Sequence, residues 1–250
     1  MVLLEARLQQ GDAEWQHFLT QARSHLAEGR DLNDPEVQQM AWRWRTSILG
    51  FVGGDLQLYE ALTQLYQQEG AEVASWGTLD APTLEYILKA VAMLSVREEL
   101  VGVALGRLAP DTHAVLAQAQ EATQKKLQIN DFLGTEGLLL GLLAVESAAA
   151  RALGEQGVDF ATAETLFRDW LAECATQPDE IPAKMPFTPR ANRVLELAAA
   201  QAKQQGGGQI APEHLLLGIL QEGETDGGMA MRVLEACRVD CELLKQQIGL

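Results

Sequence analysis

The chain has 250 residues, of which 47% are hydrophobic and 22% charged, and a formal net charge of −16, which indicates one large or two ordinary globular domains. Because no basic patch offsets the repulsion from backbone phosphates, this charge argues against a nucleic-acid partner. The sequence has no uncharged apolar run of about 18 residues and no basic-then-apolar leader, so it predicts neither membrane insertion nor secretion.

The first hundred residues carry the apolar spacing of four helices. In the first helix the apolar residues recur at i, i+3, i+4, i+7 and i+11: Trp15, Phe18, Leu19, Ala22 and Leu26. A second helix is expected to begin at Asp34-Pro35, a capping residue followed by proline at the first helical position, and to end at Gly53-Gly54. Residues 55–66 and 84–93 show the same pattern. Since no segment alternates with a period of two, the fold class is predicted to be all-α.

Several residues of this half carry a resemblance to a known family. They are Trp15, Asp34-Pro35-x-Val37-Gln38, Ala41-x-x-Trp44 and Gly53-Gly54-Asp55. The pattern resembles the TipAS domain, the antibiotic-recognition region of TipA-type regulators. The resemblance implies a globin-like helical domain over residues 1–100 that closes over thiopeptides or other elongated apolar drugs. These residues contain no cysteine and no helix-turn-helix domain precedes them, so we expect non-covalent capture and no control of a promoter.

Aromatic side chains in this half are candidates for a ligand pocket, because aromatic faces bury much area at little entropic cost. The candidates are Trp15, Trp42, Trp44, Tyr59, Tyr66 and Trp76. Trp15 and Trp44 lie in register with aliphatic residues, which favours a place in the core. Trp42 lies off that stripe, and both a pocket wall and surface packing stay open for it.

The second part of the chain repeats one helical unit. The opening segments align Leu108 with Phe187 (187 − 108 = 79), and the Glu-x-Leu-Leu-Leu-Gly motifs align Glu136 with Glu213 (213 − 136 = 77). Such a repeat is one supersecondary unit used twice, and neither copy needs to bury its core alone. We expect one domain over residues 105–250, with repeats at 105–175 and 187–250 joined by a proline-rich linker at 176–186. The boundary with the first half is expected at 97–110.

The second repeat contains the strings FTPRANRVLELA, from Phe187, and EHLLLGIL, from Glu213. With the companion repeat upstream, residues 105–250 resemble the amino-terminal domain of Clp-type AAA+ unfoldases, the ClpC kind in particular. The resemblance implies a pseudo-twofold bundle of eight short helices, without catalytic activity, that binds adaptors, substrate proteins and peptide-like antibiotics. The sequence contains no Gly-Lys dipeptide and hence no Walker A loop, so we do not expect a motor.

The same resemblance points to a peptide-binding seam between the repeats. The residues at matching positions are Phe187, Arg190, Asn192 and Glu196 in the second repeat, with Leu108 and Gln120 in the first. The alternative for Phe187 is a hydrophobic staple ahead of a helix. Glu136 and Glu213 match glutamates that recognise phosphorylated arginine, although the flanking triplets depart from the family's Thr-Glu-His; their alternative role is to complement a helix dipole.

Motifs for catalysis or for a cofactor do not appear in the sequence, and we predict a non-enzymatic protein without cofactor or metal. The four histidines are scattered, and the pair Cys237 and Cys241 spans a predicted turn between helices rather than half of a zinc site. With Cys174 the cysteine count is odd and without framework spacing, which favours the cytoplasm. The predicted function is sequestration of bulky apolar or peptide-like antibiotics. The alternative is an adaptor that binds a Clp unfoldase or its substrates.

Overall fold

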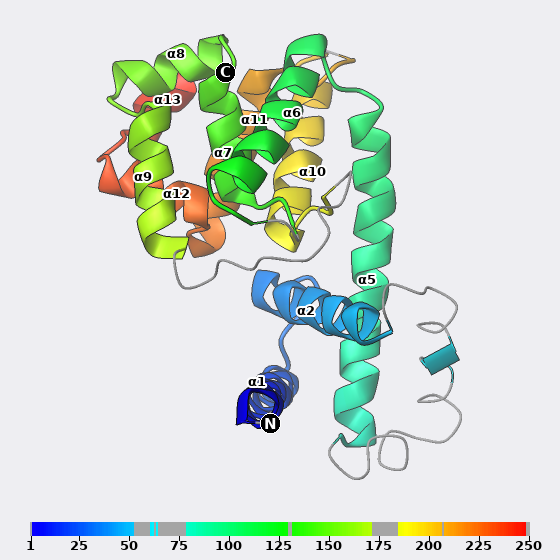
Figure 1. Cartoon of the computed structure of the whole chain (residues 1–250). Helices are drawn as coiled ribbons and strands as arrows, with labels where there is room; N and C mark the ends of the chain where they lie inside the picture. The colour runs from blue at the N-terminus through cyan, green and yellow to red at the C-terminus, as the bar shows by residue number, and fades with distance from the viewer. Residues whose placement is uncertain are drawn as a thin grey trace. The chain divides into compact units, whose positions relative to one another are not determined.

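A computed structural model describes residues 2–52, 61–62, 64, 79–129, 132–171, 185–206 and 208–248. Their helices, in chain order, are α1 (Val2–Ala27), α2 (Pro35–Phe51), α5 (Ala81–Leu105), α6 (Pro110–Lys125), α7 (Thr135–Ala144), α8 (Ala148–Glu155), α9 (Phe160–Leu171), α10 (Pro189–Gln204), α11 (Pro212–Asp226), α12 (Met229–Ala236) and α13 (Cys241–Gln247) (Figure 1). Within these residues the only β-pairing is two isolated bridges, so the predicted all-α class is confirmed. The chain divides into two compact units, Met1–Val96 and Arg97–Leu250.

The first unit contains α1, α2 and the first part of α5. The start of α2 is as predicted: Pro35 is its first residue, and Asp34 Oδ1 accepts a hydrogen bond from the Glu36 backbone N–H at 2.9 Å. The fourth predicted helix, at 84–93, lies within the longer α5. Gly53-Gly54 and most of the third predicted helix, at 55–66, lie outside the described residues.

The second unit is built on two tightly packed helix pairs, α6 with α7 and α10 with α11. Gly141 and Gly218 explain the Leu-Leu-Leu-Gly motifs, because each lies where two helix backbones touch. A Cβ atom at Gly141 would collide with the Val115 carbonyl, and one at Gly218 with the Val194 carbonyl. The matching collisions (218 − 141 = 77, 194 − 115 = 79) show that both repeats pack their helix pair in the same way.

Two parallel bridges connect the repeats reciprocally. Leu108, at the opening of the first repeat, pairs with Ile210 before α11, while Phe187, at the opening of the second, pairs with Leu133 before α7. The hydrogen bonds match as well: the Ala109 N–H donates to the Ile210 carbonyl at 2.9 Å, and the Thr188 N–H donates to the Leu133 carbonyl at 3.0 Å.

The helix contacts are reciprocal as well. Helix α6 contacts α11, and its equivalent in the second repeat, α10, contacts α7. Likewise α8 contacts α11, and its equivalent, α12, contacts α7. A tandem translation would not produce such reciprocal pairs, so the predicted pseudo-twofold arrangement of α6 to α13 is confirmed.

None of the described helices is by itself long and apolar enough to cross a bilayer. Only α7 and α8 taken together meet that length and composition, and they are bent by 96° at their junction.

Candidate functional site

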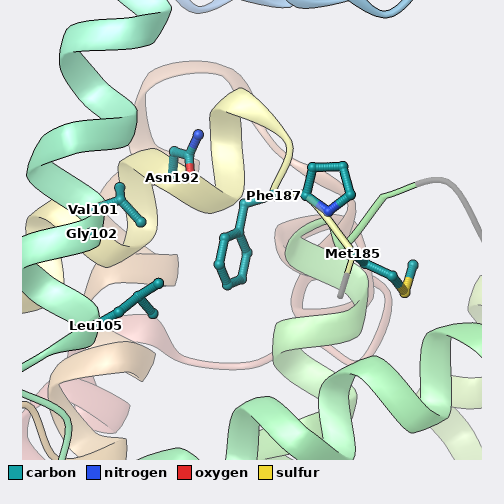
Figure 2. Close-up of a pocket in the computed structure, with 7 residues that line it drawn as sticks. Val101, Gly102, Leu105, Met185, Phe187 and Asn192 are labelled. Atoms are coloured by element: carbon teal, nitrogen blue, oxygen red, sulfur yellow. The ribbon is translucent and has the colours of Figure 1, made fainter. Parts of the chain in front are cut away.

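A pocket of about 330 Å³ opens in the second unit where the last turns of α5 face the segment leading into α10. Figure 2 shows the Phe187 ring between Val101 and Leu105 on one side and Met185 on the other. The residues that line the pocket are Val101, Gly102, Leu105, Met185, Pro186, Phe187 and Asn192. Because all but Asn192 are apolar or glycine, the pocket suits an apolar group of a ligand.

Local structure on both sides of Phe187 fixes its backbone. The bridge to Leu133 holds the residue from the side of α7. The next residue, Thr188, caps α10: its hydroxyl accepts a hydrogen bond from the Ala191 N–H at 3.2 Å, and Pro189 occupies the first helical position. A hydrophobic staple would pair Phe187 with the fourth helical residue. That residue is Asn192, which is polar, so the alternative of a staple does not hold for Phe187.

Asn192 is the polar group of this pocket. The residue is only 3% exposed, and the other residues that line the pocket are apolar or glycine. A side-chain amide carries both hydrogen-bond donors and an acceptor. Asn192 is therefore suited to orient a bound polar group.

The structure does not bring the other predicted seam residues into this pocket. Arg190 turns instead to Glu222 at the end of α11, with a distance of 2.7 Å from Nη1 to Oε1, and the Glu222 side chain is only 4% exposed. Glu196 binds Arg193 through Oε2 at 3.0 Å, and its buried Oε1 has no partner. Leu108 is buried at the reciprocal bridge, and Gln120 is half-buried on α6. Of the predicted seam, Phe187 and Asn192 line the pocket.

The two glutamates at the Leu-Leu-Leu-Gly motifs occupy different surroundings. Glu136 is 5% exposed, and its carboxylate folds over Gly134, where backbone N–H groups of both residues donate to it. Burial raises the pKa of the Glu136 carboxyl. Glu213 is half-buried in the first turn of α11. Glu136 thus satisfies the start of α7, and an incoming guanidinium group would have to displace those backbone contacts.

His214 follows Glu213 and is tied into the turn before α11. Its Nδ1 accepts a hydrogen bond from the Ala211 N–H at 2.9 Å, and its Nε2 lies 2.8 Å from the Gln205 side-chain oxygen. Burial lowers the pKa of His214. The imidazole therefore acts here as a neutral cap of α11, a role that sequence reasoning did not assign.

In the first unit, Trp15 and Trp44 stack on each other with ring centroids 5.1 Å apart, and Phe18 stacks on both. Trp44 is 4% exposed and lies in the core, whereas Trp15 is half-buried. Trp42 is only 6% exposed, so of the two interpretations left open for it surface packing does not hold. The other candidates, Tyr59, Tyr66 and Trp76, lie outside the described residues.

The cysteine pair lies as the sequence predicted, on either side of the turn between α12 and α13. Burial raises the pKa of both thiols, Cys237 and Cys241, which keeps them protonated at neutral pH. In the part of the chain that the structure describes, no group of three or more His, Cys, Asp or Glu side chains is arranged to hold a metal ion.

Comparison with known proteins finds two family matches. Residues 107–228 match the Clp repeat (R) N-terminal domain, and residues 3–94 match the TipAS antibiotic-recognition domain. Over 120 residues, 48% of this chain, the sequence is 38% identical to the chaperone protein ClpC1, chloroplastic, of Oryza sativa subsp. japonica. It is equally similar to the ATP-dependent Clp protease ATP-binding subunit ClpA homolog of Guillardia theta. The chain spans 12% and 14% of the length of these two relatives.

Solved structures similar to this chain include the N-terminal domain of ClpD from Arabidopsis thaliana, with 23% identity and a TM-score of 0.45 over 57% of this chain and 92% of that one. The Hsp104 N-terminal domain from Candida albicans has 15% identity and a TM-score of 0.45 over 57% of this chain and 89% of that one. The two family matches confirm the resemblances predicted from the sequence: residues 3–94 match the TipAS domain and residues 107–228 match the Clp repeat N-terminal domain.

Proposed function

We propose that this chain is a cytoplasmic, non-enzymatic binding protein that sequesters bulky apolar or peptide-like small molecules of the antibiotic type. The observation that carries the proposal is the pocket beside Phe187, in which apolar walls surround one polar side chain, that of Asn192. Ligand sites of this kind combine mostly apolar linings with a few polar groups that fix orientation. The match of residues 3–94 to an antibiotic-recognition domain supports the same class of ligand.

In this proposal Phe187 supplies affinity and Asn192 supplies orientation. Full burial of a phenylalanine side chain is worth roughly 1.5 to 3 kcal/mol, which corresponds to a tenfold to hundredfold change in affinity. The carboxamide of Asn192 can donate to a ligand carbonyl and accept from a ligand N–H. A peptide-like molecule offers both groups next to an apolar side chain.

The test is direct binding of a cyclic peptide antibiotic to the full chain by calorimetry, with no Clp unfoldase present. We expect saturable binding, weakened tenfold to hundredfold by Phe187→Ala. Phe160→Ala is the matched control, because Phe160 is also half-buried against the core but does not line the pocket. Failure of the antibiotic to bind, or equal losses in both variants, would contradict the proposal.

A second candidate function is an adaptor or regulator of a Clp protease, favoured by the match of residues 107–228 to a domain found in Clp ATP-binding subunits. An adaptor would change the Clp-dependent degradation of a substrate protein without any drug, and substitutions on its exposed surface would abolish that change. A sequestering protein would instead relieve inhibition of the unfoldase by the antibiotic, in proportion to its own concentration. A degradation assay with and without the antibiotic separates the two functions.

A further inference from the structure

One wall of the Phe187 pocket comes from outside the Clp repeat match. Val101, Gly102 and Leu105 belong to the end of α5 and precede residue 107, where that match begins. Figure 2 shows the side chains of Val101 and Leu105 on the side of Phe187 away from Met185. Val101 is only 3% exposed, so this wall is packed in place. The end of α5 therefore helps to set which groups enter the pocket.

Gly102 lies in this wall, and its backbone conformation does not require glycine at this position. It is inside a helix, where glycine is less favourable than alanine, and its φ is not in the left-handed region. A Cβ atom there would meet no atom within 4 Å, in contrast to Gly141 and Gly218, where helix backbones touch. Gly102 is exposed, so the space that its missing side chain leaves beside the pocket is open to solvent.

We propose that Gly102 determines the specificity of the site, as the gap through which one bulky apolar side chain of a peptide-like ligand enters beside Phe187. The inference rests on the proposed function and names the ligand class more narrowly. At about 330 Å³ the pocket lies near the lower end of the usual range of roughly 300 to 1,000 Å³ for ligand sites, so it admits one part of a ligand. The Asn192 amide then pairs with an unsubstituted peptide bond adjacent to that side chain.

The experiment titrates the full chain with the blocked tripeptide acetyl-Leu-Phe-Leu-amide and follows binding by NMR. Gly102→Leu fills the gap and is expected to weaken binding at least tenfold. It should also raise the melting temperature by a few degrees, because a helical glycine is removed. Gly102→Ala should give a similar rise with little loss of binding, since its Cβ reaches open space.

Val103→Leu is the matched control, because Val103 is the next residue of α5, is 67% exposed and does not line the pocket. It should leave the dissociation constant within about twofold, a difference below 0.5 kcal/mol. Equal binding by Gly102→Leu and the unaltered chain would overturn the inference, as would an equal loss in Val103→Leu.

A tripeptide methylated at the amide after phenylalanine tests the role of Asn192. Methylation should weaken binding to the unaltered chain but make no further difference in Asn192→Leu, which already lacks the amide. If methylation weakens binding to Asn192→Leu as much as it weakens binding to the unaltered chain, the proposed pairing with the Asn192 amide is overturned. Phe187→Ala, tested in parallel, separates the role of Gly102 from the proposed binding function. If Phe187→Ala abolishes binding while Gly102→Leu does not, the role of Gly102 is disproved and the binding function stands. If the unaltered chain binds neither the tripeptide nor a peptide antibiotic, both are disproved.

Discussion

The two repeats of the second unit share their backbone pairing but differ in what that pairing exposes. Leu108 and Phe187 hold equivalent places in reciprocal bridges, yet Leu108 is 6% exposed and sealed into the core, while Phe187 is half-buried and lines a pocket. The features that both copies keep are those that packing requires, such as Gly141 and Gly218. The candidate site lies where the copies differ, so asymmetry within the repeat is the better guide to function.

A second difference has a steric cause. Gly137 stands at the place of His214 (214 − 137 = 77), and a Cβ atom at Gly137 would collide with the Thr123 hydroxyl. In the second repeat the equivalent of Thr123 is Ala202 (202 − 123 = 79), which is small and fully buried. The first copy therefore keeps a threonine and a glycine where the second keeps an alanine and a histidine. In each copy a larger side chain at one position is matched by a smaller one at the other, which explains why the triplets around Glu136 and Glu213 diverge.

The largest expected effect concerns what the repeats share. Gly141→Ala and Gly218→Ala should each destabilise the protein by about 3 kcal/mol, the upper part of the range for overpacking, because each new methyl group meets a helix backbone. Urea denaturation measures both free energies of unfolding. Clearly unequal losses would break the claim that the repeats pack alike.

The next effect concerns an ion pair that one repeat has and the other lacks. Arg190→Ala should cost about 2 kcal/mol, less than the 3 to 5 kcal/mol of a fully buried pair, because it leaves the buried Glu222 carboxylate without this cation while Arg190 itself is 23% exposed. Its counterpart in the first repeat is Asp111 (190 − 111 = 79), which is exposed. Asp111→Ala should stay within about 0.5 kcal/mol in the same denaturation experiment, and a comparable loss there would refute the asymmetry.

The sequence predicts the features that depend on local spacing and capping, but not those that depend on tertiary packing. The repeat, the matching register of its Leu-Leu-Leu-Gly motifs and the start of α2 follow from local spacing and capping, and all three are found. The sequence pattern predicts a helix only at 84–93, whereas α5 continues to Leu105, because Val101 and Ala104, one turn apart, are buried in the core of the second unit. The pocket wall was missed for the same reason, since tertiary burial supplies it.

Within the predicted seam, neighbouring positions of α10 take different partners. Arg190 and Asn192 are two residues apart, and in an α-helix such side chains leave on different sides. The resemblance places both at the seam, but Arg190 turns to Glu222 while Asn192 lines the pocket. Only the packing of α10 against its neighbours decides which side faces a ligand.

A smaller effect separates the two glutamates. The raised pKa of Glu136 means that the folded state holds its proton more tightly than the unfolded state, so the stability it contributes is lost as pH rises above about 4.5. Glu136→Gln mimics the protonated form and should stabilise the protein by about 1 kcal/mol at pH 7, with the gain vanishing in acid. Glu213→Gln should change little. Thermal melts across pH check both, and a pH-independent gain would contradict the assignment.

The smallest effect comes from His214. Its lowered pKa means that the unfolded chain takes up a proton first, so stability should fall by less than about 1 kcal/mol as pH drops below about 6.5. Protonation would also remove the Nδ1 acceptor for the Ala211 N–H. His214→Asn should remove this pH dependence, and a slope between pH 7 and pH 5.5 that survives in the variant would assign it elsewhere.

We expect ligand binding to be confined to the Phe187 pocket and absent from the equivalent place at Leu108 in the first repeat. The most direct measurement is an NMR titration of the ¹⁵N-labelled full chain with a cyclic peptide antibiotic. We expect saturable shifts of the Gly102, Phe187 and Asn192 amides, while the amides of the equivalent bridge at Leu108 and Ile210 stay unchanged. Equal shifts at both bridges, or shifts that leave Phe187 and Asn192 untouched, would contradict it.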